Sequence, residues 1–348
     1  MFTREAPDPI LGQSDNFLAV LEKVSRVAPL AKPVLIIGER GAGKELIAAR
    51  LHFLSERWQK PYVKFNCAAL NEELLESELF GHVAGAYTGA SRPRIGRFEL
   101  AQGGTLFLDE LASMSLRLQE KLLRLVEYGE FERVGSSETL KVDVRLVGAA
   151  NQDLPALAAR GGFREDLLDR LSFDVITLPP LRERREDILL LAQKFAENMA
   201  RELDREYFAG FSPAAERALL AHDWPGNVRE LRNVVERAVY RLEQARQSVE
   251  QIEFDPFASP YRPRVSLPRA AEGEPPRPPA PPVPALSAPS LPLDFEAEVA
   301  GFEVRLLQQA LEQARFNQRR AADLLQLTYH QFRGLLRKYK LLDEARGE

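Results

Sequence analysis

The stretch PVLIIGERGAGKELIAARL (residues 33–51) decides the fold, because it joins a buried strand, a glycine-rich turn and a helix. Residues 33–38 are a short apolar run typical of a strand in a parallel sheet, and residues 44–55 have helical spacing. Between them, residues 38–44 have the spacing GxxxxGK, which in this context predicts a loop whose backbone N–H groups bind phosphates. Lys44 is then expected to reach the β- and γ-phosphates, although the spacing taken alone also fits a chance turn.

Strand and helix signals alternate beyond this stretch. Apolar runs at 105–110 and 144–151 predict two more buried strands, and residues 119–130 predict an amphipathic helix. This alternation favours an α/β fold with a parallel sheet and helices on both faces. From about residue 185 only helical segments follow. We therefore predict an α/β subdomain over residues 1–178 and a helical lid over residues 179–255.

Prolines divide the rest of the chain. Residues 256–292 hold 13 of the 24 prolines, and a segment so rich in proline cannot join a helix or a sheet. It is expected to be an extended, semi-stiff linker, or alternatively a proline-rich partner motif. The linker separates a small domain, predicted over residues 293–343.

Composition narrows the class of protein. Hydrophobic residues make up 45% and charged residues 28%, and the net charge of −4 gives the whole chain no general attraction to nucleic acid. Cys67 is the one cysteine, so an internal disulfide is excluded, and the four histidines are too scattered to favour a zinc site. No apolar run reaches ~18 residues. These features predict a cytoplasmic protein with no membrane span.

Two adjacent carboxylates, Asp109 and Glu110, end the apolar run at 105–110. Ligands bind at the carboxyl ends of parallel strands, so Asp109 is expected to hold Mg²⁺ and Glu110 to orient and polarise an attacking water. Glu45 stands where Ser or Thr usually contacts Mg²⁺, a departure for which Asp109 partly compensates. The alternative is an ordinary charged turn after a strand.

Two arginines are candidates for stabilising phosphoryl transfer. Such transfer depends on positioning and charge neutralisation, and Arg164 and Arg170 lie in the segment GFREDLLDRL, residues 162–171. The composition equally allows two solvated surface arginines.

Positive charge is concentrated in residues 315–340, which hold seven Lys or Arg and one Asp. The resulting +6 is typical of a segment that binds nucleic-acid phosphates. Asn317 and Thr328 are plausible N-caps of two short helices, which predicts a helix-turn-helix. Gln326 stands at the turn where glycine is usual, and we expect a positive φ there to cost ~1–2 kcal/mol.

The second of these helices is expected to enter the major groove of double-stranded DNA. The predicted DNA-binding residues are Thr328, Tyr329, His330, Gln331 and Arg333 at the groove, and Arg319, Arg320, Arg337 and Lys338 nearer the phosphates. Each could instead be a solvated side chain. In the preceding helix Val299, Phe302, Leu306 and Ala310 recur at helical spacing, which favours a packing or dimer helix.

Taken together, the motifs resemble one family. In chain order they are GERGAGKE, FNCAAL, ESELFGHVAGAYTGA, GGTLFLDE, FREDLLDRL, LPPLRERREDI and WPGNVREL. This series, with the C-terminal helix-turn-helix, is similar to the AAA+ activators of sigma-54 RNA polymerase, the bacterial enhancer-binding proteins. The resemblance covers nearly everything except the linker. It implies an AAA+ P-loop ATPase core with a helical lid, followed by a small all-α Fis-type domain.

The resemblance also implies a role for individual residues. ATP would be bound by Gly38, Glu39, Arg40, Gly41, Ala42, Gly43, Lys44 and Glu45, with Ile10 at the adenine and Asn151 and Arg229 as sensors. Asn66 would be the switch that holds the Glu110 carboxylate when ATP is not poised. Arg164 and Arg170 would be fingers supplied to a neighbouring subunit. Ala150 stands where the family commonly has Thr.

The segment GAYTGA corresponds to the family's GAFTGA loop, which contacts sigma-54. Its residues are Gly85, Ala86, Tyr87, Thr88, Gly89 and Ala90. Tyr87 replaces the family's phenylalanine, which keeps an aromatic ring and adds a hydroxyl.

The function implied is that of an ATP-hydrolysing activator that binds enhancer DNA and remodels sigma-54 RNA polymerase closed complexes. The family forms hexameric rings. Within it the chain resembles the phage-shock activators, which lack an N-terminal receiver domain, so we expect control of an envelope-stress operon and a separate regulatory protein acting on the core. Trp58 is a candidate docking point for that regulator or an edge-of-core residue. The alternatives are a DNA-binding regulator that no longer activates sigma-54, and a generic AAA+ remodelling ATPase.

Overall fold

A five-stranded parallel sheet in the order β2-β3-β6-β1-β7 forms the centre of the first of two compact units, Met1–Arg262 and Pro263–Glu348. Its strands are β1 Val34–Ile37, β2 Tyr62–Asn66, β3 Thr105–Asp109, β6 Arg145–Ala150 and β7 Asp174–Thr177. The structure is a computed structural model that describes residues 10–87, 90–242, 246–259, 261, 294–314, 316–339 and 341. The strands predicted at 33–38, 105–110 and 144–151 are confirmed as β1, β3 and β6.

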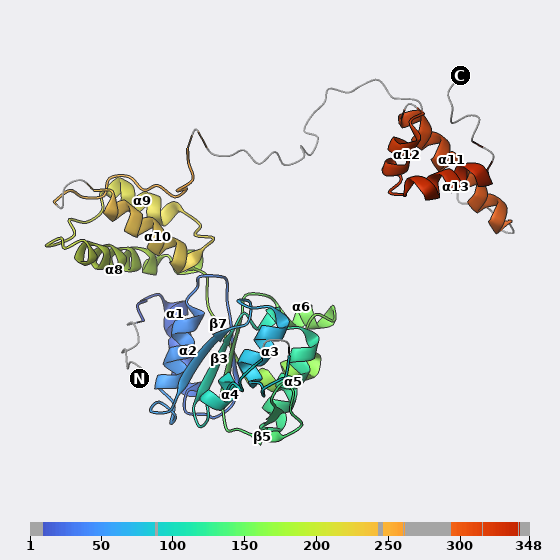
Figure 1. Ribbon diagram of the computed structural model, residues 1–348. Helices are drawn as coiled ribbons and strands as arrows, with labels where there is room; N and C mark the ends of the chain where they lie inside the picture. The colour runs from blue at the N-terminus through green and yellow to red at the C-terminus, as the bar shows by residue number, and fades with distance from the viewer. Residues whose placement is uncertain are drawn as a thin grey trace. The chain divides into compact units, whose positions relative to one another are not determined.

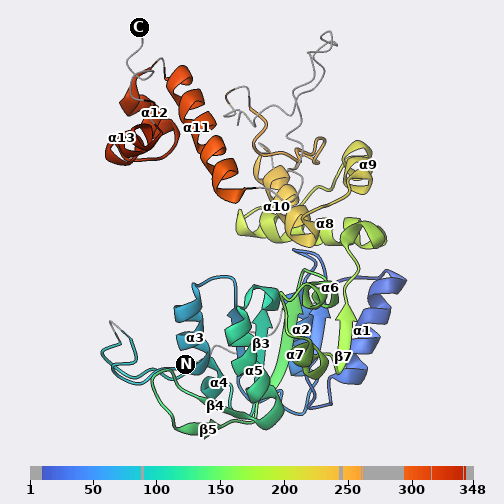
Figure 2. The same cartoon turned by 90° about the vertical axis from the view of Figure 1, so that its right-hand side faces the viewer.

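Helices cover both faces of this sheet (Figures 1 and 2). One face packs against α1 Asp15–Val27 and α2 Lys44–Phe53, and the other against α3 Glu72–Phe80, α4 Arg97–Leu100, α5 Leu116–Tyr128, α6 Leu154–Ala159 and α7 Glu165–Leu171. Alternate residues of a strand point to opposite faces, so Val34 and Ile36 join the first core while Leu35 joins the second. Short elements complete the layer: the 3₁₀ helix η1 Leu111–Ser113 and the hairpin strands β4 Glu130–Glu132 and β5 Thr139–Lys141.

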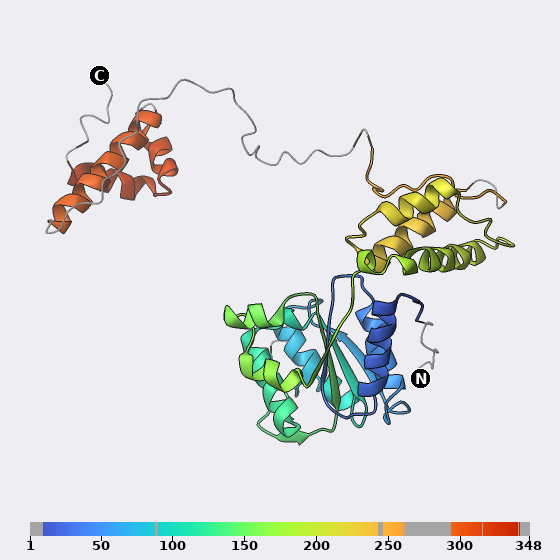
Figure 3. The ribbon, with the colours of Figure 1, turned by 180° about the vertical axis from the view of Figure 1, so that it is seen from behind.

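The lid has its own apolar core (Figure 3). It consists of η2 Leu181–Glu183, α8 Glu186–Glu202, α9 Pro213–Ala221 and α10 Asn227–Tyr240. Trp224 is fully buried in it, donates its indole N–H to the Leu219 carbonyl at 2.9 Å and meets the edge of the His222 ring. The predicted α/β core with a helical lid is therefore confirmed.

The second unit is a three-helix domain of α11 Phe295–Gln313, α12 Gln318–Leu324 and α13 Tyr329–Lys338. Both predicted N-caps form, because the side chains of Asn317 and Thr328 accept from backbone N–H groups of α12 and α13. Phe332 and Leu336 are fully buried against the other helices. Most of the predicted linker, residues 256–292, lies outside the described residues.

The prediction that the stripe Val299, Phe302, Leu306 and Ala310 packs α11 inside its own unit is largely wrong. Ala310 is buried, but Val299, Phe302 and Leu306 are exposed to 39%, 51% and 37%. Leu307 and Leu311 take the core positions instead, one residue along the chain. Both stripes repeat with the helical period, so spacing alone could not choose between them. A dimer contact through the exposed stripe stays a prediction.

Gln326 has a φ of 54°, as its position at the turn predicted. We expect Gln326→Gly to stabilise the second unit by about 1 kcal/mol, because glycine adopts this conformation without the clash of a Cβ. Calorimetry of the full chain would measure the shift in that unit's transition. Gln326→Ala, which keeps the Cβ, should gain nothing; a glycine variant less stable than wild type would contradict the expectation.

Across the part of the chain that the structure describes, no helix combines the length and apolarity required to traverse a membrane.

Candidate functional site

The parallel register brings the predicted polar residues to one edge of the sheet. Asn66 lies opposite Asp109 in the β2–β3 pair, and Ile37 lies opposite Ala150 in the β1–β6 pair. Glu110 and Asn151 therefore follow at the carboxyl ends of adjacent strands, next to the glycine-rich loop that leaves β1. This is the edge at which α/β sheets bind ligands.

A cavity of about 1660 Å³ opens at this edge and reaches to the lid. It is lined by most of the residues predicted to bind nucleotide: Ile10, Arg40, Gly41, Ala42, Gly43, Lys44, Glu45, Asn66, Asp109, Glu110, Asn151 and Arg229. Gly41 has a φ of 78°, and a Cβ there would lie 2.2 Å from the Gly226 carbonyl of the lid. Only glycine fits this close approach between loop and lid.

Lys44 is buried inside the glycine-rich loop. Its Nζ donates to the carbonyls of Gly38 at 2.9 Å and Glu39 at 3.2 Å. Desolvation lowers the pKa of Lys44, opposed by the nearby carboxylates of Asp109 and Glu110. A cation held at the start of α2, where backbone N–H groups are unpaired, suits a phosphate ligand.

Glu110 has a left-handed backbone with φ 54°, a strained conformation for a residue with a Cβ. Its carboxylate accepts a hydrogen bond from Asn151 Nδ2 at 3.4 Å, and its backbone N–H donates to Asp109 Oδ1 at 3.0 Å. The structure differs here from the expected switch, because Asn66 Oδ1 accepts from the backbone of Ala68 at 2.9 Å rather than holding Glu110. Asn151 takes that position in this state.

Glu45 lies in the first turn of α2 and forms an ion pair with Lys64 on β2 at 2.6 Å. Both side chains are more than half exposed, so the pair contributes about 1 kcal/mol or less to stability. The lysine neutralises the carboxylate that replaces the usual hydroxyl.

The donor set near Asp109 fits Mg²⁺. This ion binds through one or two carboxylates and takes its other oxygens from water and phosphates. Asp109 offers a half-buried carboxylate at the carboxyl end of β3, within the same cavity as Lys44. Among the described residues no cluster of three or more His, Cys, Asp or Glu could hold a metal ion.

Arg164 and Arg170 do not line the cavity of their own chain. Arg164 directly precedes α7, without a side-chain capping hydrogen bond, and pairs with Asp166 at 2.7 Å, while Arg170 pairs with Glu127 at 2.7 Å. Their placement on an exposed helix leaves the surface-arginine alternative open within one chain.

Backbone hydrogen bonds connect the described residues of the GAYTGA segment. Gly85, with φ 81°, donates its N–H to the Ala90 carbonyl at 2.7 Å, and Ala90 donates to the Tyr87 carbonyl at 3.0 Å. The Tyr87 ring is 39% exposed and meets the edge of the buried His82 ring at 5.2 Å. His82 is held by Ser77 Oγ at 2.7 Å. Thr88 and Gly89 lie outside the described residues.

Glu39 belongs to the predicted phosphate loop but contacts the lid. Its two carboxylate oxygens accept from Arg182 at 2.6 and 2.9 Å and from Asn227 Nδ2 at 3.0 Å. These hydrogen bonds, the one from Arg182 first, lower the pKa of Glu39 from 4.5 to about 2. Sequence reasoning missed both lid partners, although each lies in a segment that carried the family resemblance, LPPLRERREDI or WPGNVREL.

We expect Glu39→Gln to destabilise the first unit by about 1 kcal/mol or less at neutral pH, because Arg182 loses its charged partner. A carboxylate with a lowered folded-state pKa stabilises the fold above its unfolded pKa, and this contribution disappears as pH falls through the folded pKa. The difference between variant and wild type should therefore shrink between pH 4.5 and about 2. Urea unfolding across this range measures it; a difference that grows with acidity would contradict the assignment.

In the second unit the predicted DNA-binding residues divide into two groups. Thr328 and Gln331 form a capping box, in which Gln331 Oε1 accepts from the Thr328 N–H at 3.0 Å, so their side chains first serve the start of α13. Lys338 pairs with Glu303 at 3.3 Å, and the Arg319 guanidinium lies 5.7 Å from the centre of the Tyr329 ring. Arg320, His330, Arg333 and Arg337 form the second group; like Arg319, Thr328, Gln331 and Lys338, they are exposed.

Trp58 is 54% exposed and lines the cavity, which fits both the docking-point and the edge-of-core alternative.

Comparisons with known proteins agree with this geometry. The Sigma-54 interaction domain family matches residues 10–177, the AAA+ ATPase lid domain family residues 182–260, and the family "Bacterial regulatory protein, Fis family" residues 298–339. The chain is 55% identical over 337 residues to the Psp operon transcriptional activator of Escherichia coli. These aligned residues cover 97% of this chain and 99% of that relative.

Two further similarities are partial. The transcriptional regulatory protein ZraR of Salmonella typhimurium is 50% identical over 67% of this chain, which spans only 53% of ZraR. The crystal structure of NtrX from Brucella abortus in complex with ATP matches with a TM-score of 0.66 and 32% identity, over 95% of this chain and 69% of NtrX. With a near full-length relative well above 30% identity, the chain belongs to the sigma-54-dependent transcriptional activators, AAA+ ATPases that carry a Fis-type DNA-binding domain.

Proposed function

We propose that this protein hydrolyses ATP to remodel sigma-54 RNA polymerase closed complexes from enhancer DNA, at a phage-shock or envelope-stress operon. The observation that carries the proposal is the meeting of Lys44, Asp109 and Glu110 in one cavity with the GAYTGA loop on the same subdomain. A generic remodelling ATPase would need neither this loop nor the Fis-type domain. A regulator that no longer activates sigma-54 would not need the loop.

In the proposed reaction each residue has a defined task. Backbone N–H groups at the start of α2 and Lys44 bind the phosphates, Asp109 would hold Mg²⁺, and Glu110 orients the attacking water. The metal would neutralise charge on the phosphates. Asn151 and Asn66 are both near enough to the cavity to take the Glu110 carboxylate in alternate states.

The proposal extends to assembly. Arg164 and Arg170 do not line the cavity of their own chain, which suits fingers donated to a neighbouring protomer in a hexameric ring. The exposed Trp58 is the proposed docking point of a separate regulatory protein. Because the proposed partner is enhancer DNA on the chromosome, we propose that the protein acts in the cytoplasm.

The proposed domain boundaries are 1–178 for the α/β subdomain, 179–255 for the lid, 256–292 for the linker and 293–343 for the Fis-type domain. In the last of these, the exposed Arg333 and His330 are proposed to reach base edges, and Arg320 and Arg337 to bind phosphates.

We expect Tyr87→Ala and Thr88→Ala to keep ATP hydrolysis within a few fold of wild type while losing open-complex formation on a sigma-54 promoter. The reason is that the described residues of the loop do not line the cavity that contains Lys44 and Glu110 and, in this proposal, the loop transmits rather than performs the chemistry. Tyr87→Phe is the matched control: it restores the family's residue, keeps the ring that packs on His82, and should stay active. Promoter opening by Tyr87→Ala or Thr88→Ala at the wild-type rate would refute the role of the loop.

A further inference from the structure

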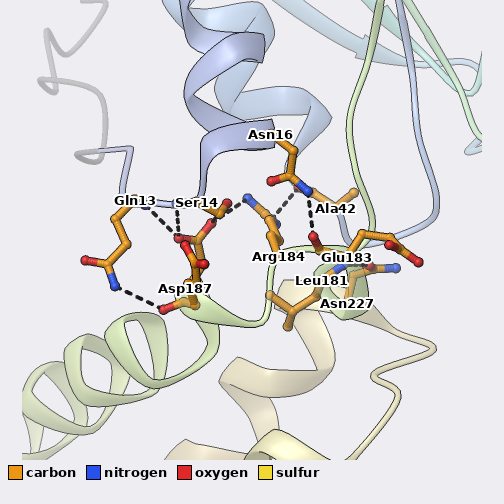
Figure 4. Close-up of polar contacts among 10 residues, drawn as sticks. Gln13, Ser14, Asn16, Ala42, Leu181, Glu183, Arg184, Asp187 and Asn227 are labelled. Atoms are coloured by element: carbon orange, nitrogen blue, oxygen red, sulfur yellow. Dashed lines mark hydrogen bonds and ion pairs between the residues drawn. The ribbon is translucent and has the colours of Figure 1, made fainter.

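The junction between the lid and the α/β subdomain contains a set of buried polar groups that the chemistry above does not use (Figure 4). Asp187 and Asn227 are both 0% exposed, and Arg184 is 3% exposed. Burying a charged or amide group without partners costs several kcal/mol, so such groups persist where their hydrogen bonds fix a specific arrangement.

Asp187, in the first turn of α8, holds the segment that precedes α1. Its Oδ1 accepts from the backbone N–H groups of Gln13 at 2.6 Å and Ser14 at 3.0 Å, and its Oδ2 accepts from Ser14 Oγ at 2.9 Å. A Cβ at Gly12 would lie 3.0 Å from the same Oδ2, so the backbone lies against the carboxylate. The two residues immediately before Gly12, Ile10 and Leu11, line the cavity. Through Asp187, the lid thus sets the position of the cavity wall that Ile10 and Leu11 form.

Asn227, the first residue of α10, holds a second wall of the cavity, the phosphate loop. Its Nδ2 donates to the Arg40 carbonyl at 3.1 Å and to the Glu39 carboxylate at 3.0 Å, and its Oδ1 accepts from the Leu181 N–H at 2.8 Å. The backbone of Asn227 is left-handed with φ 52°, which is a strained conformation for a residue with a Cβ. This conformation directs the side-chain amide at the phosphate loop.

Arg184 lies between the two anchors. It donates to the Ala42 carbonyl of the phosphate loop at 3.3 Å, lies 3.9 Å from Asp187 and covers the Phe17 ring at 4.5 Å. It also lines the cavity, and its buried Nε has no hydrogen-bond partner among the described residues. The junction is therefore continuous from one cavity wall to the other.

We propose that Asp187 and Asn227 are positioning residues that latch the lid to both walls of the nucleotide cavity, so that nucleotide affinity depends on this latch. The inference rests on the proposed function, because it assigns a further role at the same site. Coupling between sites is reciprocal: if the latched lid strengthens nucleotide binding, bound nucleotide must strengthen the latch by the same factor.

The test compares five forms of the full chain: wild type, Asp187→Asn, Asn227→Gly, the double variant with both changes, and Glu186→Gln. Asp187→Asn removes the charge with little change in shape, and Asn227→Gly removes the amide while allowing the positive φ. Glu186→Gln is the matched control, because it converts the neighbouring, exposed carboxylate of the same helix turn. Titration with a fluorescent ATP analogue, well below the unfolding temperature of each form, gives the dissociation constant, and steady-state hydrolysis gives KM and kcat.

We expect each junction variant to bind about 10-fold more weakly, a typical coupling factor, and to raise KM with kcat within about twofold of wild type. The double variant should lose less than the product of the two effects, since either change releases the lid. Glu186→Gln should match wild type. Should Asp187→Asn not fold, Ser14→Ala removes one of the three bonds from the other side and is expected to weaken binding about threefold.

A second readout follows the latch directly. Adding the ATP analogue should slow hydrogen exchange at the Gln13 and Ser14 amides in wild type, and much less in Asn227→Gly. Folded junction variants that bind nucleotide like wild type would overturn the latch alone. A wild-type chain that binds no nucleotide would instead overturn the proposed function and the latch with it.

Discussion

Replacing Glu110 with Ala is expected to reduce ATP hydrolysis by ~100- to 10,000-fold while leaving ATP binding within a few fold of wild type. Glu110 directly follows β3 in a strained backbone, and its carboxylate is held by Asn151 at the cavity edge, where a water attacking the γ-phosphate would have to be oriented. In our proposal Lys44 and the phosphate loop bind the nucleotide, and this binding does not require the Glu110 carboxylate.

The measurement pairs phosphate release with nucleotide titration on the same protein. Glu110→Gln is the matched variant, since it keeps the shape and removes only the charge, and we expect it to be equally inactive. Hydrolysis by either variant at more than a tenth of the wild-type rate would remove Glu110 from the assigned role.

Replacing Arg164 with Ala is expected to reduce hydrolysis by roughly 10³- to 10⁵-fold, the range for a finger arginine supplied to a neighbour's γ-phosphate. In its own chain Arg164 pairs with Asp166, away from the cavity. If the arginine acts on the neighbour, an Arg164→Ala protomer retains an intact cavity and lacks only the finger it gives away.

Mixing two variant proteins therefore distinguishes an arginine finger supplied to a neighbouring protomer from a surface arginine. Combining Arg164→Ala with Glu110→Ala protein should restore part of the activity, because the intact cavity of the first then receives a finger from the second. Arg160→Ala, which replaces an exposed arginine four residues before Arg164, serves as the control and should leave hydrolysis unchanged. No gain on mixing, with each variant shown to assemble, would favour the surface-arginine alternative.

The α/β core could be predicted because its signals are local. A buried strand, a glycine turn and a helix occupy adjacent positions, and the parallel register then forces Asp109 and Asn151 to one edge without further information. The same holds for the caps at Asn317 and Thr328, which depend on residues two or three positions away.

The remaining features depend on contacts distant in sequence. Glu39 turns from the phosphate loop to Arg182 and Asn227, more than 140 residues on, and nothing in its neighbourhood indicates that. The core face of α11 depends on which stripe of the helix meets α12 and α13, and both stripes have the same period. The partner of Glu110 depends on which of two asparagines holds it in a given state, a choice that residue identity does not determine.

Promoter opening by the purified full chain tests the central claim most directly. With sigma-54 RNA polymerase on a supercoiled template that carries the enhancer, permanganate footprinting should detect melted promoter DNA when ATP is added. A non-hydrolysable ATP analogue, or the Glu110→Ala protein, should give none. Equal melting with ATP and with the analogue, or no melting by a chain that hydrolyses ATP and binds the enhancer, would contradict the account.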